Sequence, residues 1–194
     1  AAGMGGGSAD AAAMLRLAPR LAPLPKGAAE AIAARLGADV PGQLQPGPSL
    51  ATGAGEVVWR LRELGPYAVL ALPQPFGLST ADVYAEADRL GLTRDGAELT
   101  SLRDRLARAL PAIPEELVTN DLQRAALSLA GELEDALRTV RDAGADQALV
   151  CGSGPTVIGL FWGRDGAARA WRATEGLTAR GLEAIVAEPV RDGP

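Results

Sequence analysis

The chain has 194 residues, is 47% hydrophobic and 22% charged, and carries a formal net charge of −5, a balance that indicates a soluble globular protein of one or two domains. The acidic balance without a basic block argues against nucleic acid as a partner, and no apolar run reaches the ~18 residues of a membrane helix. The lack of histidine excludes His-based triads and argues against a zinc site, and the single cysteine, Cys151, fits a reducing cytoplasm.

The first ten residues, AAGMGGGSAD, place four glycines before a helical stretch. Ser8 is a favoured N-cap residue, so we expect a helix from Ala9 to about Ala18, which Pro19 ends. A glycine loop at a helix N-terminus presents free N–H groups that suit a phosphate, and the alternative is a flexible glycine linker. The stretch matches neither a P-loop, which needs Gly-Lys-Ser/Thr, nor the GxGxxG dinucleotide fingerprint.

The following segment predicts a second helix and a short hairpin. Apolar residues recur at helical spacing between Ala29 and Leu36, and Gly37 is the expected C-cap. Residues 38–41 should leave this helix in an extended turn. Two short strands should flank the glycine-rich segment 51–55, the second of them over 57–61.

A domain boundary is expected near Gly65-Pro66, which gives domains 1–65 and 66–194. The sequence pattern of the second domain predicts the β-α-β-β-α-β order of a ferredoxin-like unit with extra helices inserted. Ser79 should open its first helix, with Asp82 completing a capping box, and Asn120 should cap a later one. The expected strands are 67–72, 148–151, 156–162 and 182–187, and the expected helices begin near 79, 99, 120, 133 and 165.

Three further places have both a structural and a functional interpretation. The segment 151–156, CGSGPT, is a Gly-Pro hairpin turn or a second glycine loop, with Cys151 as a small buried residue. Asp39 is either a turn residue or a base that accepts a proton from an alcohol. Tyr84 is either a core aromatic residue of an amphipathic helix or a ring on which a base stacks.

Taken in order, these motifs resemble those of the GHMP kinases over nearly the whole chain. The residues from Gly3 to Ala12 are similar to the family's phosphate loop, and the segment 36–41, LGADVP, is similar to the one that supplies its catalytic aspartate. The other matching segments are TGAGE at 52–56, GLSTADVY at 77–84, NDL at 120–122 and GSGPT at 152–156. Gly42 stands where the family usually has an aromatic residue.

The resemblance implies an α+β, two-domain GHMP architecture, with an ATP-binding N-terminal domain and a ferredoxin-like C-terminal domain. It implies an ATP-dependent kinase that phosphorylates the 2-hydroxyl of 4-(cytidine 5′-diphospho)-2-C-methyl-D-erythritol in the non-mevalonate isoprenoid pathway. The resemblance further implies that Asp39 is the base and that Thr80 and Tyr84 bind the cytidylyl substrate. It also implies a Mg²⁺ ion that bridges the phosphates, with Ser8 as one contact. The ATP-binding residues are Ala1, Ala2, Gly3, Met4, Gly5, Gly6, Gly7, Ser8 and Ala9, and the supporting glycine loop is Gly152, Ser153 and Gly154.

The family pattern also predicts roughly ninety residues before Ala1, carrying a catalytic lysine, so the 194-residue chain alone is expected to be inactive. The alternatives are another GHMP small-molecule kinase, of the homoserine or mevalonate type, and a non-catalytic nucleotide-binding relative. The expected partners are ATP and the cytidylyl substrate, without nucleic acid or membrane, in the cytoplasm. The sequence leaves the oligomeric state open.

Overall fold

A computed structural model of the chain describes residues 3–45, 47–61, 64–111 and 113–189. These residues form two compact units: residues 3–4 with residues 64–189, and residues 5–61. Within the described residues the chain passes from one unit to the other after Met4 and again between residues 61 and 64. None of the helices in the described ranges is long and apolar enough to cross a membrane.

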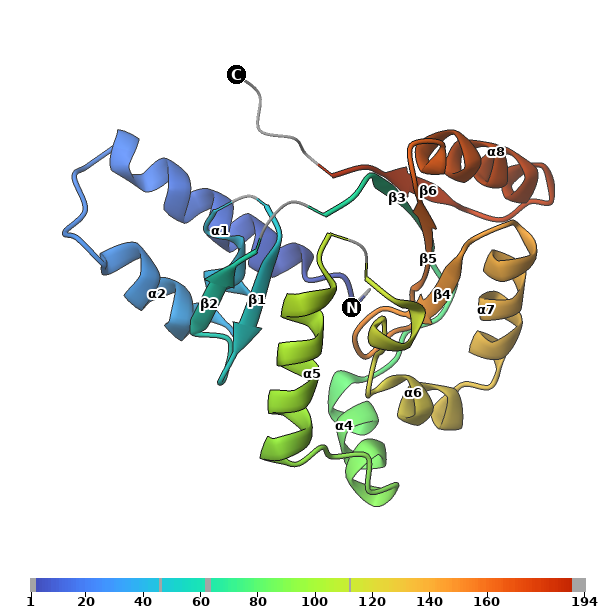
Figure 1. Cartoon of the computed structure of the whole chain (residues 1–194), viewed down its shortest axis with the longest axis horizontal. Helices are drawn as coiled ribbons and strands as arrows, with labels where there is room; N and C mark the ends of the chain where they lie inside the picture. Colours follow the sequence, from blue (N-terminus) through green and yellow to red (C-terminus); the bar gives the residue numbers. More distant parts are fainter. Residues whose placement is uncertain (1–2, 46, 62–63, 112, 190–194) are drawn as a thin grey trace. The chain divides into compact units, whose positions relative to one another are not determined.

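The smaller unit consists of three helices and a hairpin (Figure 1). Helices α1 (Gly6–Leu17), α2 (Ala28–Leu36) and α3 (Val40–Gln43) meet around a small core of buried apolar residues, Ala12, Ala33 and Val40. A 3-10 turn, η1 (Ala18–Arg20), follows α1 where Pro19 stops the α-helix. Strands β1 (Ser49–Thr52) and β2 (Val57–Arg60) pair antiparallel, as the glycine-rich turn between them predicts.

The larger unit contains a four-stranded antiparallel sheet in the order β4-β5-β3-β6. Its strands are β3 (Tyr67–Leu72), β4 (Gln147–Val150), β5 (Val157–Trp162) and β6 (Ile185–Ala187). The first strand thus lies inside the sheet between the third and fourth, which is the ferredoxin-like order that the sequence predicts. The predicted α+β class and ferredoxin-like unit are confirmed.

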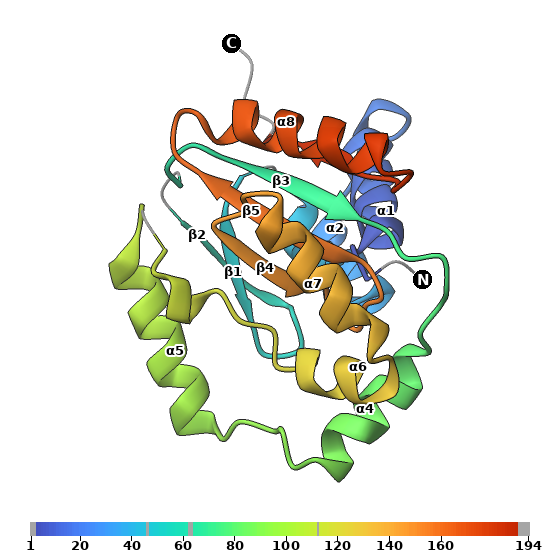
Figure 2. The ribbon, with the colours of Figure 1, turned by 90° about the vertical axis from the view of Figure 1, so that its right-hand side faces the viewer.

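Helices α7 (Glu132–Asp142) and α8 (Gly166–Ala179) pack on one face of this sheet (Figures 1 and 2). Alternate residues of β5 are buried beneath them, Val157 and Phe161 among them, because successive side chains of a strand point to opposite faces. Gly159 lies between these two, where an added Cβ would stand 2.9 Å from the Cβ of Ala145. The missing side chain therefore lets the end of α7 approach the sheet closely.

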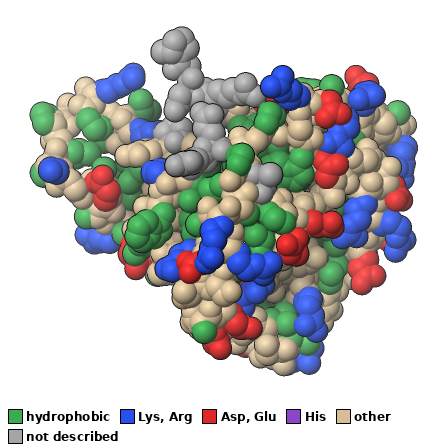
Figure 3. All heavy atoms as spheres, in the orientation of Figure 1, with side chains coloured by type: hydrophobic (Ala, Val, Ile, Leu, Met, Phe, Trp, Pro, Cys, Tyr) green, Lys and Arg blue, Asp and Glu red, His purple; other side chains and the backbone are tan. Residues whose placement is uncertain are grey.

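Between β3 and α7 the described residues contain three helices and a 3-10 turn: α4 (Thr80–Arg89), α5 (Gly96–Ala109), η2 (Glu115–Leu117) and α6 (Gln123–Leu129). Helix α4 packs against α6, and α5 begins at a capping box between Asp95 and Glu98 that the sequence analysis missed. On the face seen in Figure 3, acidic and basic side chains lie interspersed and do not gather into patches of one sign.

Several local predictions were wrong. Helix α1 begins at Gly6 with Gly5 as its N-cap, and Ser8 lies inside its first turn, because a glycine at φ 63° can redirect the chain two residues earlier. Residues 40–43 form the short helix α3 and not an extended turn, since Pro41 is compatible with a first helical turn.

The predicted caps were also partly wrong. Ser79 accepts the N–H of Asp82 as predicted, but the structure shows no reciprocal bond from the Asp82 side chain. Asn120 lies two residues before Leu122, the N-cap of α6; its Oδ1 accepts the N–H of Leu122, and its Nδ2 donates to carbonyls near the end of β4. Strand β6 begins at Ile185, three residues after the predicted start.

Candidate functional site

The opening loop turns at two glycines. Gly3 and Gly5 have φ values of 71° and 63°, in the left-handed region that residues with a Cβ rarely adopt. Gly6 and Gly7 then begin α1, and a Cβ on either would meet no atom within 4 Å. The backbone of Gly6 and Gly7 is therefore uncovered on the side where a Cβ would stand, and the first N–H groups of a helix, which have no partner within the helix, suit a phosphate. Ser8 is half-buried and Ala9 and Met4 are exposed, whereas the predicted residues Ala1 and Ala2 lie outside the described residues.

Asp39 lies next to this loop within the smaller unit. A Cβ placed on Gly5 would stand 3.7 Å from Oδ2 of Asp39 and 3.5 Å from Nε2 of Gln43. Asp39 is exposed and its side chain does not cap α3, so its carboxylate is free for another partner. The structure thus brings together two predicted elements, the loop and the aspartate, that are more than thirty positions apart in the sequence.

The backbone around Asp39 is held by burial of the next residue, by a backbone hydrogen bond and by contact with the β1–β2 hairpin. Val40, the next residue, is buried in the core of the smaller unit, and its N–H donates to the Gly37 carbonyl at 3.2 Å. The hairpin turn of β1 and β2 approaches so closely that a Cβ on Gly55 would overlap the carbonyl oxygen of Ala38. This contact explains the glycine at 55, which the sequence analysis recorded only as part of a motif.

Two arginines fix the segment that follows. Arg16 of α1 donates to the Gln43 carbonyl at 2.6 Å, and Arg60 of β2 donates to the Gln45 carbonyl at 2.8 Å and to that of Gly42 at 3.3 Å. Bonds from a charged donor are stronger than those between neutral groups. They tie α1, α3 and the hairpin together around the predicted base.

The second glycine loop lies within the larger unit, where it joins β4 to β5 and meets the start of the opening loop. A Cβ on Gly152 would stand 2.9 Å from the Gly3 carbonyl oxygen, and one on Gly3 would overlap the carbonyl oxygen of Cys151. Two backbones pack directly on each other here, which only glycine permits. The segment is therefore both the predicted hairpin turn and a support for Gly3.

Thr80, a predicted substrate residue, is hydrogen-bonded to this second loop. Its Oγ1 lies 3.0 Å from Oγ of Ser153, which is buried. Tyr84 follows one turn later on α4 with 56% of its surface exposed, so the core interpretation of this ring is wrong. An exposed ring is available for stacking.

Cys151 is a structural residue of the same loop. Burial raises the pKa of its thiol, which disfavours the thiolate that a nucleophile requires. Its N–H donates to the Thr156 carbonyl at 2.8 Å, closing the turn. It therefore contributes packing and backbone geometry.

The described residues contain no group of three or more His, Cys, Asp or Glu side chains that could hold a metal ion. Ser8 and Asp39 are oxygen donors of the kind that Mg²⁺ accepts, and Mg²⁺ is commonly held by one or two protein oxygens together with substrate phosphates. The residues present thus fit a Mg²⁺ ion that arrives with a nucleotide, and they do not form a resident metal cage.

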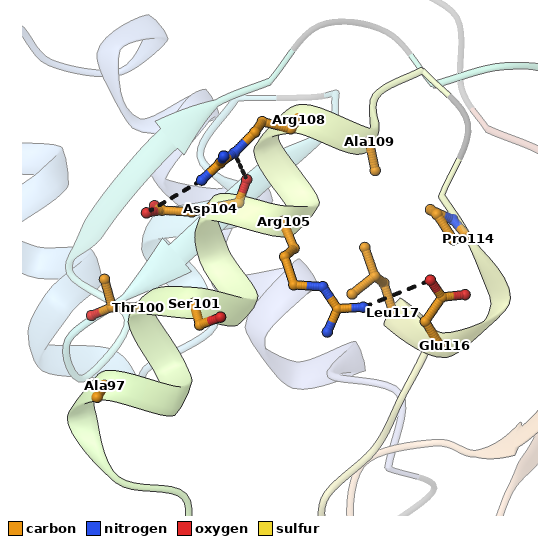
Figure 4. Close-up of a pocket in the computed structure, with 10 residues that line it drawn as sticks. All are labelled: Ala97, Thr100, Ser101, Asp104, Arg105, Arg108, Ala109, Pro114, Glu116 and Leu117. Carbon is orange, nitrogen blue, oxygen red and sulfur yellow. Dashed lines mark hydrogen bonds and ion pairs between the residues drawn. The ribbon is translucent and has the colours of Figure 1, made fainter.

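The pockets of the larger unit lie apart from the predicted residues. One, of 740 Å³, is formed by α5 and the η2 segment, and Figure 4 shows the charged residues that line it. Arg105 pairs with Glu116 at 3.6 Å and Arg108 with Asp104 at 4.0 Å. These exposed pairs leave little net charge, so the pocket is a solvated groove of mixed sign. A second pocket, of 490 Å³, lies between α7 and α8.

Comparison with known proteins identifies the class. Residues 101–175 match the family described as "GHMP kinases C terminal". The chain is 44% identical over 164 residues to the 4-diphosphocytidyl-2-C-methyl-D-erythritol kinase of Mycolicibacterium gilvum, covering 80% of this chain and 51% of that protein. It is 37% identical over 199 residues to the kinase of the same name from Anaeromyxobacter sp. strain K, covering 100% of this chain and 62% of the relative.

Solved structures agree. A crystal structure of 4-(cytidine 5′-diphospho)-2C-methyl-D-erythritol kinase superposes with a TM-score of 0.74 at 30% identity, over 96% of this chain and 66% of that one. A homoserine kinase from Cytophaga hutchinsonii superposes with a TM-score of 0.71 at 18% identity, over 97% of this chain and 66% of that one, and shows the shared fold alone.

The chain belongs to the GHMP kinases. Within that family it is similar to the 4-diphosphocytidyl-2-C-methyl-D-erythritol kinases, the name that both curated relatives above carry. The resemblance predicted from the motifs is thereby confirmed. The chain spans about half to three-fifths of the length of these relatives.

Proposed function

We propose that the protein transfers the γ-phosphoryl group of ATP to the 2-hydroxyl of 4-(cytidine 5′-diphospho)-2-C-methyl-D-erythritol, a step of non-mevalonate isoprenoid synthesis. The observation that carries the proposal is the position of the Asp39 carboxylate beside Gly5, at the start of an open helix N-terminus. Phosphoryl transfer depends mainly on holding the phosphates and on placing a base at the acceptor hydroxyl. The relatives' names supply the identity of the acceptor.

The nucleotide role falls to the opening loop. Residues 1–9 would bind the triphosphate through bare backbone, because Gly6 and Gly7 carry no side chain and border open space. Ser8 and Asp39 would supply protein oxygens to a Mg²⁺ ion that arrives with the nucleotide. Such an ion neutralises charge that develops on the transferring group. On this proposal, residues 1–65 belong to an ATP-binding domain and residues 66–194 to the GHMP C-terminal domain.

Asp39 would act as the base. Its carboxylate is not used as a helix cap, and the backbone around it is held by Val40, Gly55 and the two arginines. Rigid placement matters because a base must lie within hydrogen-bond reach of the proton that it accepts. The acceptor hydroxyl would donate its proton to Asp39 as its oxygen attacks the γ-phosphorus and ADP leaves.

The acceptor's base would stack on Tyr84, with Thr80 one turn away along α4. Stacking of a base on an aromatic ring contributes ~1–3 kcal/mol. The Thr80 hydroxyl already contacts Ser153, so a bond to substrate would add to that interaction or replace it. A chain with a single cysteine cannot form an internal disulfide, which is consistent with a reducing cytoplasm as the place of the reaction.

The test is a panel of acceptors. The complete product of the gene in which this chain occurs is purified and assayed with ATP and Mg²⁺ against the cytidylyl alcohol, homoserine and mevalonate, with ADP release as the readout. The proposal predicts turnover with the cytidylyl alcohol and kcat/KM at least about a hundredfold lower with the other two, as expected where buried polar groups are matched to one substrate. Turnover of homoserine or mevalonate in preference would assign another GHMP activity. ATP binding without any transfer would indicate a non-catalytic relative.

A further inference from the structure

The Asn120 side chain donates hydrogen bonds to the end of β4 and to the second glycine loop. Its Nδ2 group donates to the Val150 carbonyl at 2.8 Å and to the Gly152 carbonyl at 2.7 Å. Its Oδ1 accepts the N–H of Leu122 at 3.1 Å. Both donors of the amide and its carbonyl are thus used, so the side chain is fixed in one orientation.

The same segment holds the strand before the loop. Oε1 of Gln123 accepts the N–H of Val150 at 2.9 Å, so Val150 is bonded through its N–H by one side chain and through its carbonyl by another. Gln123 is the first residue of α6. The end of β4 and the beginning of the turn are therefore clamped to the start of α6.

Gly152, which accepts a hydrogen bond from Asn120, also lies against the opening loop. Gly152 has φ 55°, and a Cβ on it would stand 2.9 Å from the Gly3 carbonyl oxygen. Because these backbones are already in contact, the position of Gly152 limits where Gly3 can lie. Asn120 thus acts on Gly3 through one intermediate residue, all within the larger unit.

We propose that Asn120 is a positioning residue for nucleotide binding: its amide fixes Gly152, which holds Gly3 and with it the start of the phosphate loop. This inference rests on the proposed function of that loop. It assigns to Asn120 a role that acts through the loop and does not require contact with either substrate.

The discriminating variant is Asn120→Asp. It preserves the shape of the side chain and the acceptor for Leu122, but it removes both donated bonds and places a carboxylate against two carbonyl oxygens. Gln123→Glu is the matched control, because it brings the same charge to the same strand end while keeping the acceptor for the Val150 N–H. Leu177→Ala, at a buried position of α8, controls for a general loss of stability.

Two measurements on the complete gene product test the inference. The first, without nucleotide, is amide exchange by NMR at Cys151 and Gly154, whose N–H groups donate within the turn, together with the chemical shift of Gly3. We expect Asn120→Asp to accelerate exchange and shift Gly3, and both controls to leave them near wild type. The second is calorimetric affinity for ATP, where we expect the dissociation constant of Asn120→Asp to rise about tenfold or more, since the variant leaves the carbonyl of the buried Val150 without its side-chain donor, and an unpaired buried acceptor can shift an equilibrium by that factor.

The outcomes separate this inference from the proposed function. Unchanged exchange and an unchanged Gly3 shift in Asn120→Asp would overturn the inference whatever the nucleotide result. An affinity loss no larger than that of Leu177→Ala would overturn it as well. If the wild-type protein bound no ATP while Asn120→Asp still loosened the turn, the structural link would stand and the proposed function would fall.

Discussion

Gly6 offers a test in which stability and nucleotide binding should move in opposite directions. It is the first residue of α1, is exposed, and has no atom within 4 Å of an added Cβ. Gly6→Ala should therefore fit without strain. Alanine is favoured over glycine in a helix by roughly 0.5–1 kcal/mol, so the free energy of unfolding should stay constant or rise by up to about 1 kcal/mol.

Binding should weaken because the added methyl group occupies the open space beside the first N–H groups of α1. Hydrogen bonds to a charged group contribute about 1.5–3 kcal/mol each, so the loss of one corresponds to a rise of roughly 10- to 150-fold in the dissociation constant for ATP. The change is measured by calorimetry on the complete gene product, and the free energy of unfolding by urea denaturation of the same samples.

Gly176→Ala is the matched control. Gly176 is an exposed residue inside α8, where an added Cβ also meets nothing within 4 Å. Alanine there should raise stability by a similar amount and leave ATP affinity unchanged. If Gly6→Ala bound ATP as tightly as the wild type, bare backbone at Gly6 would not be needed, and the assignment of the phosphate loop would be refuted.

Three further predictions concern other parts of the molecule. Gly3→Ala should loosen the turn at Cys151, because the added Cβ would overlap the Cys151 carbonyl oxygen and because a residue with a Cβ loses about 1–2 kcal/mol at a left-handed φ. If the turn moved to relieve this overlap and ATP affinity stayed at the wild-type value, the prediction would be contradicted. Tyr84→Ala should raise KM for the cytidylyl alcohol about 5- to 150-fold and leave KM for ATP constant, while Tyr84→Phe stays near wild type; equal effects on both KM values would argue against stacking. The hydrogen bonds from Arg169 lower the pKa of Asp146, so this pair should stabilise the fold above the ordinary aspartate pKa and lose that contribution as pH falls through the lower folded value. In Asp146→Asn, the free energy of unfolding should fall less steeply than in the wild type as the pH is lowered. If it fell equally steeply in both, the Arg169–Asp146 pair would not contribute to stability.

Much of the fold could be predicted from local patterns. The apolar strand at 67–72, the alternation at 157–162 and the helical spacing around Leu133 each predicted the element that the structure contains. The ferredoxin-like strand order could be predicted because the elements occur in the order β-α-β-β-α-β, and few sheet topologies are compatible with that order. Element ends were less accurate, since glycines at positive φ, such as Gly5, set them without a side-chain signal.

The candidate site was predictable in its parts and not in its arrangement. The motifs pointed to the opening loop, Asp39 and the second glycine loop, but sequence alone could not show that Gly5 lies beside Asp39 or that Gly3 contacts Gly152. Such contacts depend on backbone approach between distant segments, which leaves no local pattern. Asn120 was misjudged for the same reason: as a helix cap it had a plausible local role, whereas its side chain bonds to carbonyls thirty positions away.

The central claim is that Asp39 is the base of a phosphoryl transfer from ATP to the 2-hydroxyl of the cytidylyl alcohol. The most direct measurement is the single-turnover rate of Asp39→Asn in the complete gene product, with ³¹P NMR identifying the product and calorimetry measuring ATP affinity in parallel. A general base contributes typically ~10²–10⁴-fold, so the account predicts a fall of that size in rate, with ATP affinity near wild type and the wild-type product phosphorylated at the 2-hydroxyl. A variant that kept more than about a third of the wild-type rate, well above what loss of a base allows, would contradict the account.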